Sequence, residues 1–219
     1  LYVPSDDLSV RITADYDDYD EICCAVGSTS YGAGNQITAA FGGQIIPNDP
    51  FTKKAFYDSD PISQGDNSGL SIHIEKNLDN ATIESITSYR NSYNFEIQDV
   101  DFDAVNIVAP SPIKKDLNGI TQEIRIYSED NEKFNWLFGG FYYQEDMDFN
   151  ESIYFGPLWR PYIDAFLPVG TIAEVASAFG LPDSLMFAAG QGNMESATQD
   201  NSTKSIFAQF DIQLSERLN

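Results

Sequence analysis

Histidine, cysteine and basic side chains are scarce in this chain of 219 residues. It contains 1 histidine, 2 cysteines and 12 lysine or arginine residues against 34 aspartate or glutamate residues, so its formal net charge is −22 at pH 7. This balance argues against nucleic acid as a partner, because binding to phosphate needs the opposite sign of charge. The acidity instead fits a solvated exterior or loops that attract cations.

The scarcity of cysteine and histidine also limits the chemistry of the chain. Cys23 and Cys24 are adjacent and give no conventional disulfide framework, so a vicinal disulfide and two free thiols both stay open. They match no zinc pattern, because partner ligands at metal-binding spacing are missing. The single histidine, His73, has no nucleophile on a G-x-S-x-G elbow to work with. We therefore expect the chain not to be an enzyme.

Long hydrophobic runs are absent as well. No segment approaches the ~18 consecutive apolar residues that a transmembrane helix needs, which excludes a helical membrane span. A membrane β-barrel is not excluded by this absence, because only every second residue of its strands is apolar.

Alternation of apolar and polar residues is the main feature that the chain does have, and it predicts β-strands. Six strands are expected, at residues 8–16, 69–76, 81–100, 118–128, 133–146 and 204–214. The phase changes at Ile86, which suggests a β-bulge there or an end of the strand that protein covers. In 133–146 aromatic residues occupy both faces, so the outward face of that strand stays open.

The connections between these strands alternate in length. Short polar turns are expected at 4–7, 77–80, 129–132 and 215–218, and long loops at 17–68, 101–117 and 149–202, with one short helix within 170–180. Short turns at one rim and long loops at the other are typical of outer-membrane barrels. A soluble β-sandwich has no reason to collect its long loops at one end.

The strand sequences, taken in order, resemble those of TonB-dependent outer-membrane receptors. The resemblance is carried by PSDDLSVRITADY at 4–16, IESITSYRNSY at 83–93, TQEIR at 121–125, WLFGGFYY at 136–143 and SIFAQFDIQLSERL at 205–218. In the last of these, Ala208 stands where the family usually has glycine. The resemblance covers the strands, about half of the chain, and leaves the long loops unmatched.

This resemblance implies an all-β fold of six antiparallel strands that form part of a transmembrane barrel of about 22 strands with a plugged lumen. Six strands cannot close alone, so we expect the chain to be a segment of a longer protein whose plug domain and TonB-contacting segment lie elsewhere. It further implies location in the outer membrane of a Gram-negative bacterium, with membrane lipid, the plug domain and the TonB complex as partners.

The function implied by the resemblance is active transport. Extracellular loops would bind a scarce nutrient, such as an iron–siderophore complex, a cobalamin-like cofactor or a saccharide or other organic ligand, and the barrel would import it. Two alternatives remain: a passive porin-like or adhesive outer-membrane barrel, and a soluble extracellular β-sandwich that binds cations or glycans.

Two groups of residues are candidates for contacts in such a transporter. Polar residues expected to face the lumen are Arg11, His73, Glu123, Arg125, Gln209 and Asp211. They would pack against the plug or contact substrate directly. Aromatic residues expected in the extracellular loops are Tyr31, Phe51, Tyr57, Tyr154, Trp159 and Tyr162. They would hold ligand by stacking and apolar contact, or pack among themselves as a rim.

Acidic runs offer the only candidate metal ligands. Asp15, Asp17, Asp18 and Asp20 could bind Ca²⁺, and so could the set Asp99, Asp101 and Asp103. Neither set has the spacing of an EF-hand, and a solvated acidic rim is the competing interpretation. No other cofactor is expected.

Overall fold

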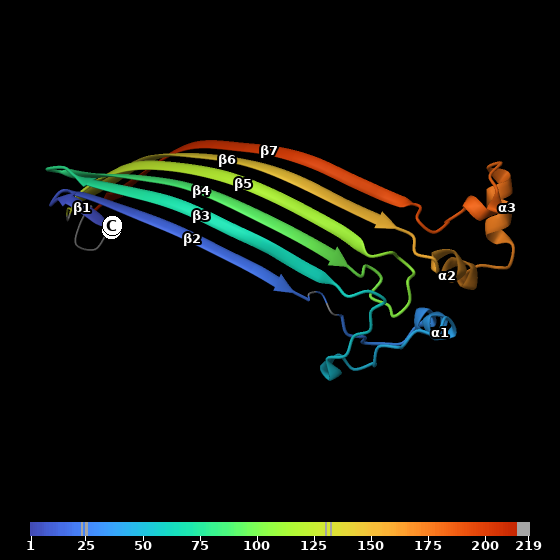
Figure 1. Cartoon of the computed structure of the whole chain (residues 1–219). Helices are drawn as coiled ribbons and strands as arrows, with labels where there is room; N and C mark the ends of the chain where they lie inside the picture. Colours follow the sequence, from blue (N-terminus) through green and yellow to red (C-terminus); the bar gives the residue numbers. More distant parts are fainter. Residues whose placement is uncertain (23, 25, 130, 132, 214–219) are drawn as a thin grey trace.

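The computed structural model describes residues 1–22, 24, 26–129, 131 and 133–213, which form one long antiparallel β-sheet with short helices beyond one end (Figure 1). Its strands are β1 (Tyr2–Ser5), β2 (Leu8–Glu21), β3 (Ile62–Asn77), β4 (Ala81–Gln98), β5 (Ser111–Ser128), β6 (Phe134–Tyr154) and β7 (Gly192–Ile212). Each strand pairs with its neighbours in sequence, in the order β1 to β7, and the sheet is open. The all-β, antiparallel prediction is therefore confirmed.

The helices lie in the long connections. They are α1 (Ala33–Ala40), α2 (Trp159–Phe166) and α3 (Thr171–Ala178), with single 3₁₀ turns η1 (Pro50–Thr52) and η2 (Asp183–Leu185). The predicted helix within 170–180 is α3, whereas α1 and α2 were not expected. We call this end of the sheet the loop end and the opposite end, with its tight connections, the turn end (Figure 1). Among the described helices, none is long and apolar enough to cross a membrane.

All six predicted strands exist, but most are longer than expected at the loop end. The loops correspondingly shrink from 17–68, 101–117 and 149–202 to 22–61, 99–110 and 155–191. The segment Ser63–Ser68 shows the cause, because its Gly, Asn and Asp residues suggest a loop but pair continuously with β2 and β4. Neighbouring strands supply the backbone hydrogen bonds that override weak strand propensity. At the loop end, only the strand predicted at 81–100 is shorter than expected, because β4 ends at Gln98. At the turn end, β7 ends at Ile212 instead of 214.

Two predictions about the turn end need correction. The predicted turn at 4–7 is tight only at Asp6 and Asp7, because Tyr2–Ser5 forms β1 against β2. The bulge suspected at Ile86 is wrong: the register between β3 and β4, and between β4 and β5, is uninterrupted. Ile86 lies on the polar side of the sheet, paired with His73 and Glu123. The turn predicted at 215–218 lies outside the described residues.

The register assigns every strand residue to one of two faces, because directly paired residues in neighbouring strands point the same way. Val10, Ile74, Ser85, Ile124 and Ile206 form one transverse row, which defines what we call the isoleucine face. The opposite side, which we call the polar face, carries the predicted lumen-facing residues Arg11, His73, Glu123, Arg125, Gln209 and Asp211. These six residues therefore share a face, and that this face lines a lumen stays a prediction.

The open question about β6 is settled by the same register. Trp136, Phe138 and Tyr142 lie on the isoleucine face, because Ile126 pairs with Phe138 and Gln122 pairs with Tyr142. Leu137, Phe141 and Tyr143 lie on the polar face, where Glu123 pairs with Phe141. Each aromatic set therefore belongs to a defined side of the sheet.

The isoleucine face is exposed although it is apolar. Ile124 is 53% exposed and Ile206 is 93% exposed. Other large apolar residues exposed on this face are Ile12, Tyr16, Leu70, Ile74, Ile83, Tyr89, Ile120, Phe134, Phe138, Phe210 and Ile212. The hydrophobic residues that the described part of the chain buries, namely Val105, Ile107, Ile172 and Ala176, all lie in loops or in α3. The sheet thus has no hydrophobic core of its own.

A line of three tyrosines runs diagonally across this apolar surface, through Tyr16 on β2, Tyr89 on β4 and Tyr142 on β6. Tyr93 on β4 and Tyr154 on β6 lie on the same face, further toward the loop end. Through the register, Tyr16 aligns with Asn91, two residues beyond Tyr89, and Tyr89 aligns with Gln144, two residues beyond Tyr142. The tyrosine line therefore shifts by one residue per strand, which corresponds to a tilt of about 35° for a rise of ~3.3 Å per residue and a strand spacing of ~4.8 Å.

Gly139 gives a test of packing on the polar face. A Cβ at this position would overlap the ring of Phe207, its partner on β7, in an arrangement where an aromatic ring covers a strand glycine. We expect Gly139→Ala to lower the free energy of unfolding by about 1–3 kcal/mol, because the ring must move. Denaturant titration monitored by tryptophan fluorescence measures this change.

The neighbouring residue provides the control. A Cβ at Gly140 would lie 3.7 Å from the carbonyl oxygen of Ser205, which is an ordinary contact. Gly140→Ala should therefore leave the free energy of unfolding nearly unchanged. Equal losses in the two variants would contradict the proposed ring contact.

Candidate functional site

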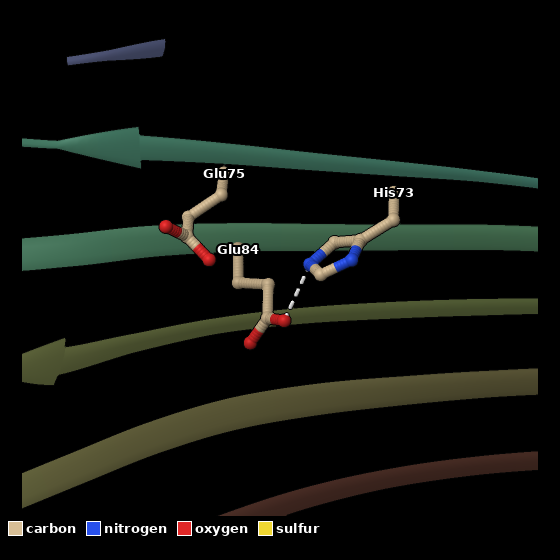
Figure 2. A group of neighbouring side chains, drawn as sticks. All are labelled: His73, Glu75 and Glu84. Carbon is tan, nitrogen blue, oxygen red and sulfur yellow. Dashed lines mark ion pairs between the residues drawn. The ribbon is translucent and has the colours of Figure 1, made fainter. Parts of the chain in front are cut away.

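A charged cluster occupies the polar face near the turn end, and Figure 2 shows its central members. His73 on β3, Glu84 on β4, and Glu123 and Arg125 on β5 come together because Glu84 pairs directly with Arg125 and lies diagonally from His73. Glu84 is 7% exposed. Its Oε2 accepts a hydrogen bond from Nε of Arg125, and its Oε1 lies 2.5 Å from Nε2 of His73. The latter contact is an ion pair rather than an aligned hydrogen bond.

Arg125 contacts more than one carboxylate of this cluster. Nη1 of Arg125 also lies 3.4 Å from Oε1 of Glu123, so the guanidinium bridges two carboxylates. His73, Glu75 and Glu84 each offer an atom within 4.8 Å of the others, which is a spacing that a metal ion could use (Figure 2). However, Arg125 already places a positive charge on Glu84, and it would repel a second cation there. We interpret the cluster as an ion-pair network.

The remaining predicted polar-face residues are Arg11, Gln209 and Asp211. Arg11 on β2 pairs with His73 in the register. Gln209 and Asp211 lie on β7, where Nε2 of Gln209 donates to Oδ2 of Asp211 at 3.0 Å. Between them and Arg125 stand Gly139 and the ring of Phe207. The structure therefore groups the six residues on one face but into two separate sets.

A second cluster, of acidic residues, lies at the loop end. Asp58 comes from the loop 22–61, and Asp99 and Asp101 come from the loop 99–110. One carboxylate oxygen from each residue lies within 4.8 Å of the others. Asp99 is 2% exposed, and neither of its oxygens has a hydrogen-bond partner among the described residues. By contrast, Asp101 accepts backbone hydrogen bonds from Asp103 and Val108.

Burial and mutual repulsion perturb this acidic cluster. Burial, with the neighbouring Asp101 carboxyl, raises the pKa of Asp99 to about 7. Burial is also the main cause that raises the pKa of Asp58 and of Asp101 above the ordinary value. Three carboxyl groups in so small and dry a space favour the uptake of a positive charge.

The calcium ligands predicted on β2 do not form one site. Asp15 and Asp17 lie on the polar face, whereas Asp18 and Asp20 lie on the isoleucine face, because side chains alternate along a strand. Asp15 instead forms an ion pair with Arg90 at 2.9 Å, and Asp17 accepts a hydrogen bond from Asn67 at 3.1 Å. Among the described residues, no metal-like grouping includes any of these four aspartates.

The second predicted acidic set is correct in part. Asp99 and Asp101 come together, but Asp103 does not join them and instead accepts a hydrogen bond from Oγ1 of Thr38 in α1 at 2.5 Å. Asp58 was missed, because nothing in the sequence indicates that residues 41 positions apart in two different loops would meet. Only the order of the strands brings these two loops together.

The predicted loop aromatics have different surroundings. Trp159 stacks on Phe155 with ring centroids 4.7 Å apart, and Tyr162 packs against Phe166 at 5.1 Å. Tyr154 ends β6 and pairs with Gly192. These contacts fit a rim that packs on itself, which was one of the two interpretations left open.

The other three predicted loop aromatics are an exposed residue, a residue beside Asp99 and a residue that borders a cavity. Phe51 is 89% exposed, and Tyr57 lies close enough to Asp99 that, after burial, this carboxyl contributes to the raised pKa of the phenol. Tyr31 borders a cavity of about 520 Å³ against α1. A second cavity of about 330 Å³ shares Asn35 and Ile45 with the first, and it reaches Asp101 and Asp103. Both volumes are within the size range of small-ligand pockets.

The redox question about the cysteines is answered for one of them. Cys24 is disulfide-bonded and has a φ of 75°. Cys23 lies outside the described residues.

Comparison with known proteins adds no relative: no family model, no curated protein and no solved structure matches this chain.

Proposed function

We propose that this chain is a segment of the barrel of a TonB-dependent outer-membrane transporter, which binds a scarce nutrient at its loop end and imports it through the lumen. The observation that carries the proposal is the exposed apolar surface of the isoleucine face, with its diagonal line of tyrosines. A continuous apolar surface of this size on a sheet needs a cover, which is protein, lipid or a partner.

The tilt of the tyrosine line favours lipid as that cover. A band that is horizontal in a membrane crosses tilted strands with a shift at each strand, and barrel strands tilt by about 35–45°. The shift of one residue per strand from Tyr16 to Tyr142 corresponds to about 35°. A packed second sheet gives no reason for tyrosines to follow such a line, whereas a lipid–water boundary does, because tyrosine prefers that boundary.

The isoleucine face also carries a group of polar side chains, and their hydrogen bonds make them compatible with lipid as the cover. Thr87 donates to Oε1 of Gln122 at 2.5 Å, and Nε2 of Gln122 donates to Oγ of Ser85 at 3.0 Å and to the carbonyl of Glu123. Side-chain polar groups that bond to one another cost much less in an apolar medium than free ones.

The polar face and the loop end support the transport part of the proposal. The ion-pair network around Glu84 needs a wet or protein-filled interior, which a lumen with a plug would provide. The cavities beside α1 lie at the end where long loops gather, so a ligand could reach them from outside. The order of the strand motifs resembles TonB-dependent receptors, and it favours active uptake over a porin.

Fractionation of cells that express the full-length protein tests the membrane part of the proposal. We expect recovery in the outer-membrane fraction and release only by detergent. Recovery in the aqueous fraction without detergent would contradict both barrel interpretations and favour the β-sandwich.

Uptake assays test the transport part. Cells with and without TonB are supplied with a radiolabelled ferric siderophore, cobalamin or oligosaccharide panel, and uptake of one of them should require both TonB and this protein. Uptake that depends on the protein but persists without TonB would instead favour the porin alternative.

A further inference from the structure

We propose that Asp58, Asp99 and Asp101 form a calcium site that joins the loop 22–61 to the loop 99–110. This inference does not depend on the proposed function, since calcium would bind there whether or not the protein transports a nutrient.

The unpartnered oxygens of the acidic cluster are the first argument. Asp99 is 2% exposed, and among the described residues both of its carboxylate oxygens, together with Oδ1 of Asp58, are buried without a hydrogen bond of regular geometry. Their polar neighbours are the backbone of Asp58 and the carboxyl of Asp101, both within the cluster. A buried carboxylate without compensation is costly, and proteins supply a cation, a donor or a proton for it. Within the part of the chain that the structure describes, no lysine or arginine forms an ion pair with Asp58, Asp99 or Asp101.

The positions of these oxygens fit one ion. Calcium binds oxygen ligands at about 2.3–2.6 Å, so two ligands on opposite sides of it are about 5 Å apart. The three carboxylate oxygens lie within 4.8 Å of one another, which allows all of them to contact the same ion. The site contains only oxygen donors, which favours a hard cation over zinc or copper.

A neutral oxygen next to the carboxylates can add to the coordination. Oγ of Ser59, the residue after Asp58, is buried without a partner among the described residues. The side-chain amide of Asn106 donates toward Asp58, while its Oδ1 lies against Gly156. Calcium takes six to eight oxygens in flexible geometry, whereas magnesium demands a tighter octahedron and keeps its water. A group of carboxylate and hydroxyl oxygens from two loops therefore fits calcium better.

Occupancy of this site would affect the cavity beside it. Asp101 and Asp103 line the 330 Å³ cavity, and Asp103 holds α1 through Thr38. A cation on Asp101 would fix the loop 99–110 against Asp58 and thereby fix the wall of that cavity. Any ligand that uses the cavity would bind more tightly in the presence of calcium, since binding and ordering are linked.

Calorimetry on the full protein, folded in detergent and freed of cations with a chelator, tests the site. We expect one calcium ion per chain with micromolar to millimolar affinity. Asp99→Asn and Asp58→Asn should each weaken this binding by about tenfold or more, because each removes a charged ligand. The matched control is Asp18→Asn, which removes the same charge from an exposed position on β2 and should leave calcium affinity unchanged.

Terbium luminescence locates the ion. Tyr57 lies near Asp99 and can transfer excitation energy to Tb³⁺ bound in its place. Tyr57→Phe should reduce the sensitised emission at least twofold while calcium affinity stays the same, and added calcium should quench the emission of the unmodified protein.

Three results would overturn the inference. They are the absence of calcium binding at millimolar concentration in protein with native circular dichroism, equal loss of binding in Asp18→Asn and Asp99→Asn, and terbium emission that is independent of Tyr57. The first result would mean that a proton, shared between Asp99 and Asp101, compensates the cluster instead.

Discussion

Ile124→Lys is expected to destabilise the membrane-assembled protein by about 2–4 kcal/mol, the cost of a lysine at the midplane of a barrel's lipid face. Ile124 lies on the isoleucine face, in the row that runs from Val10 to Ile206, and it is 53% exposed. A charge at this depth loses its hydration without gaining a partner. Denaturant titration of protein folded into lipid vesicles measures the loss.

Two further variants of the same strand make the result specific. Thr121→Lys introduces the same charge three residues away on the polar face, and it should cost less than about 1 kcal/mol. Ile124→Phe should be nearly neutral if lipid covers the isoleucine face, because lipid chains adapt to a larger side chain. If packed protein covered the face, Ile124→Phe would cost about 1–3 kcal/mol through overpacking, and that outcome would contradict the proposed membrane location.

Glu84→Gln is the second substitution for which we expect a large effect, a loss of about 1–3 kcal/mol in the free energy of unfolding. The amide keeps the shape of the side chain but leaves Arg125 and His73 without the carboxylate that both contact. Removing one partner of a buried pair costs about 3–5 kcal/mol, and we reduce that figure because Arg125 is about one-third exposed and retains Glu123.

Glu75 offers a control substitution, for which the expected change in the free energy of unfolding has the opposite sign. It pairs directly with Glu84 across β3 and β4, and like charges in that position repel each other. Glu75→Gln should therefore be neutral or stabilise the fold by a few tenths of a kcal/mol. Combining Glu84→Gln with Arg125→Gln in a double-mutant cycle isolates the pair, and additive losses would show that the two side chains are not coupled.

The sequence predicted which strand residues share a face of the sheet better than it predicted where the strands begin and end. Period-2 alternation placed Ile120, Ile124 and Ile126 together on one face of the sheet. This assignment is robust, because a shift of one residue would move every side chain of the strand to the other face. The ends of the strands were placed short, since segments such as Ser63–Ser68 have weak strand propensity and are held by their neighbours. The faces of β6 needed the register with β5, because its aromatic residues lie on both sides.

In the candidate sites too, the sequence indicated the face of a residue but not the residues that it contacts. The polar-face residues followed from alternation, but their ion pairs depend on which residue stands opposite, as with Glu84 and Arg125. Glu84 itself was not singled out, although a glutamate paired with an arginine was available once strand order was assumed. Asp58 was beyond reach, because its contact with Asp99 joins two loops that no local pattern connects.

The strict neighbour-to-neighbour order of the sheet has a consequence for the time course of folding. The hairpins β3–β4 and β5–β6 close through turns of a few residues, whereas β2–β3, β4–β5 and β6–β7 must close much longer loops. Because closing a short loop costs less entropy, we expect the two short hairpins to form first and the long-loop pairings to join them afterwards. Pulsed cross-linking of cysteines at the paired positions Ser71 and Ser88 should precede that at Thr13 and Ser71, and the reverse order would rule out assembly by hairpins.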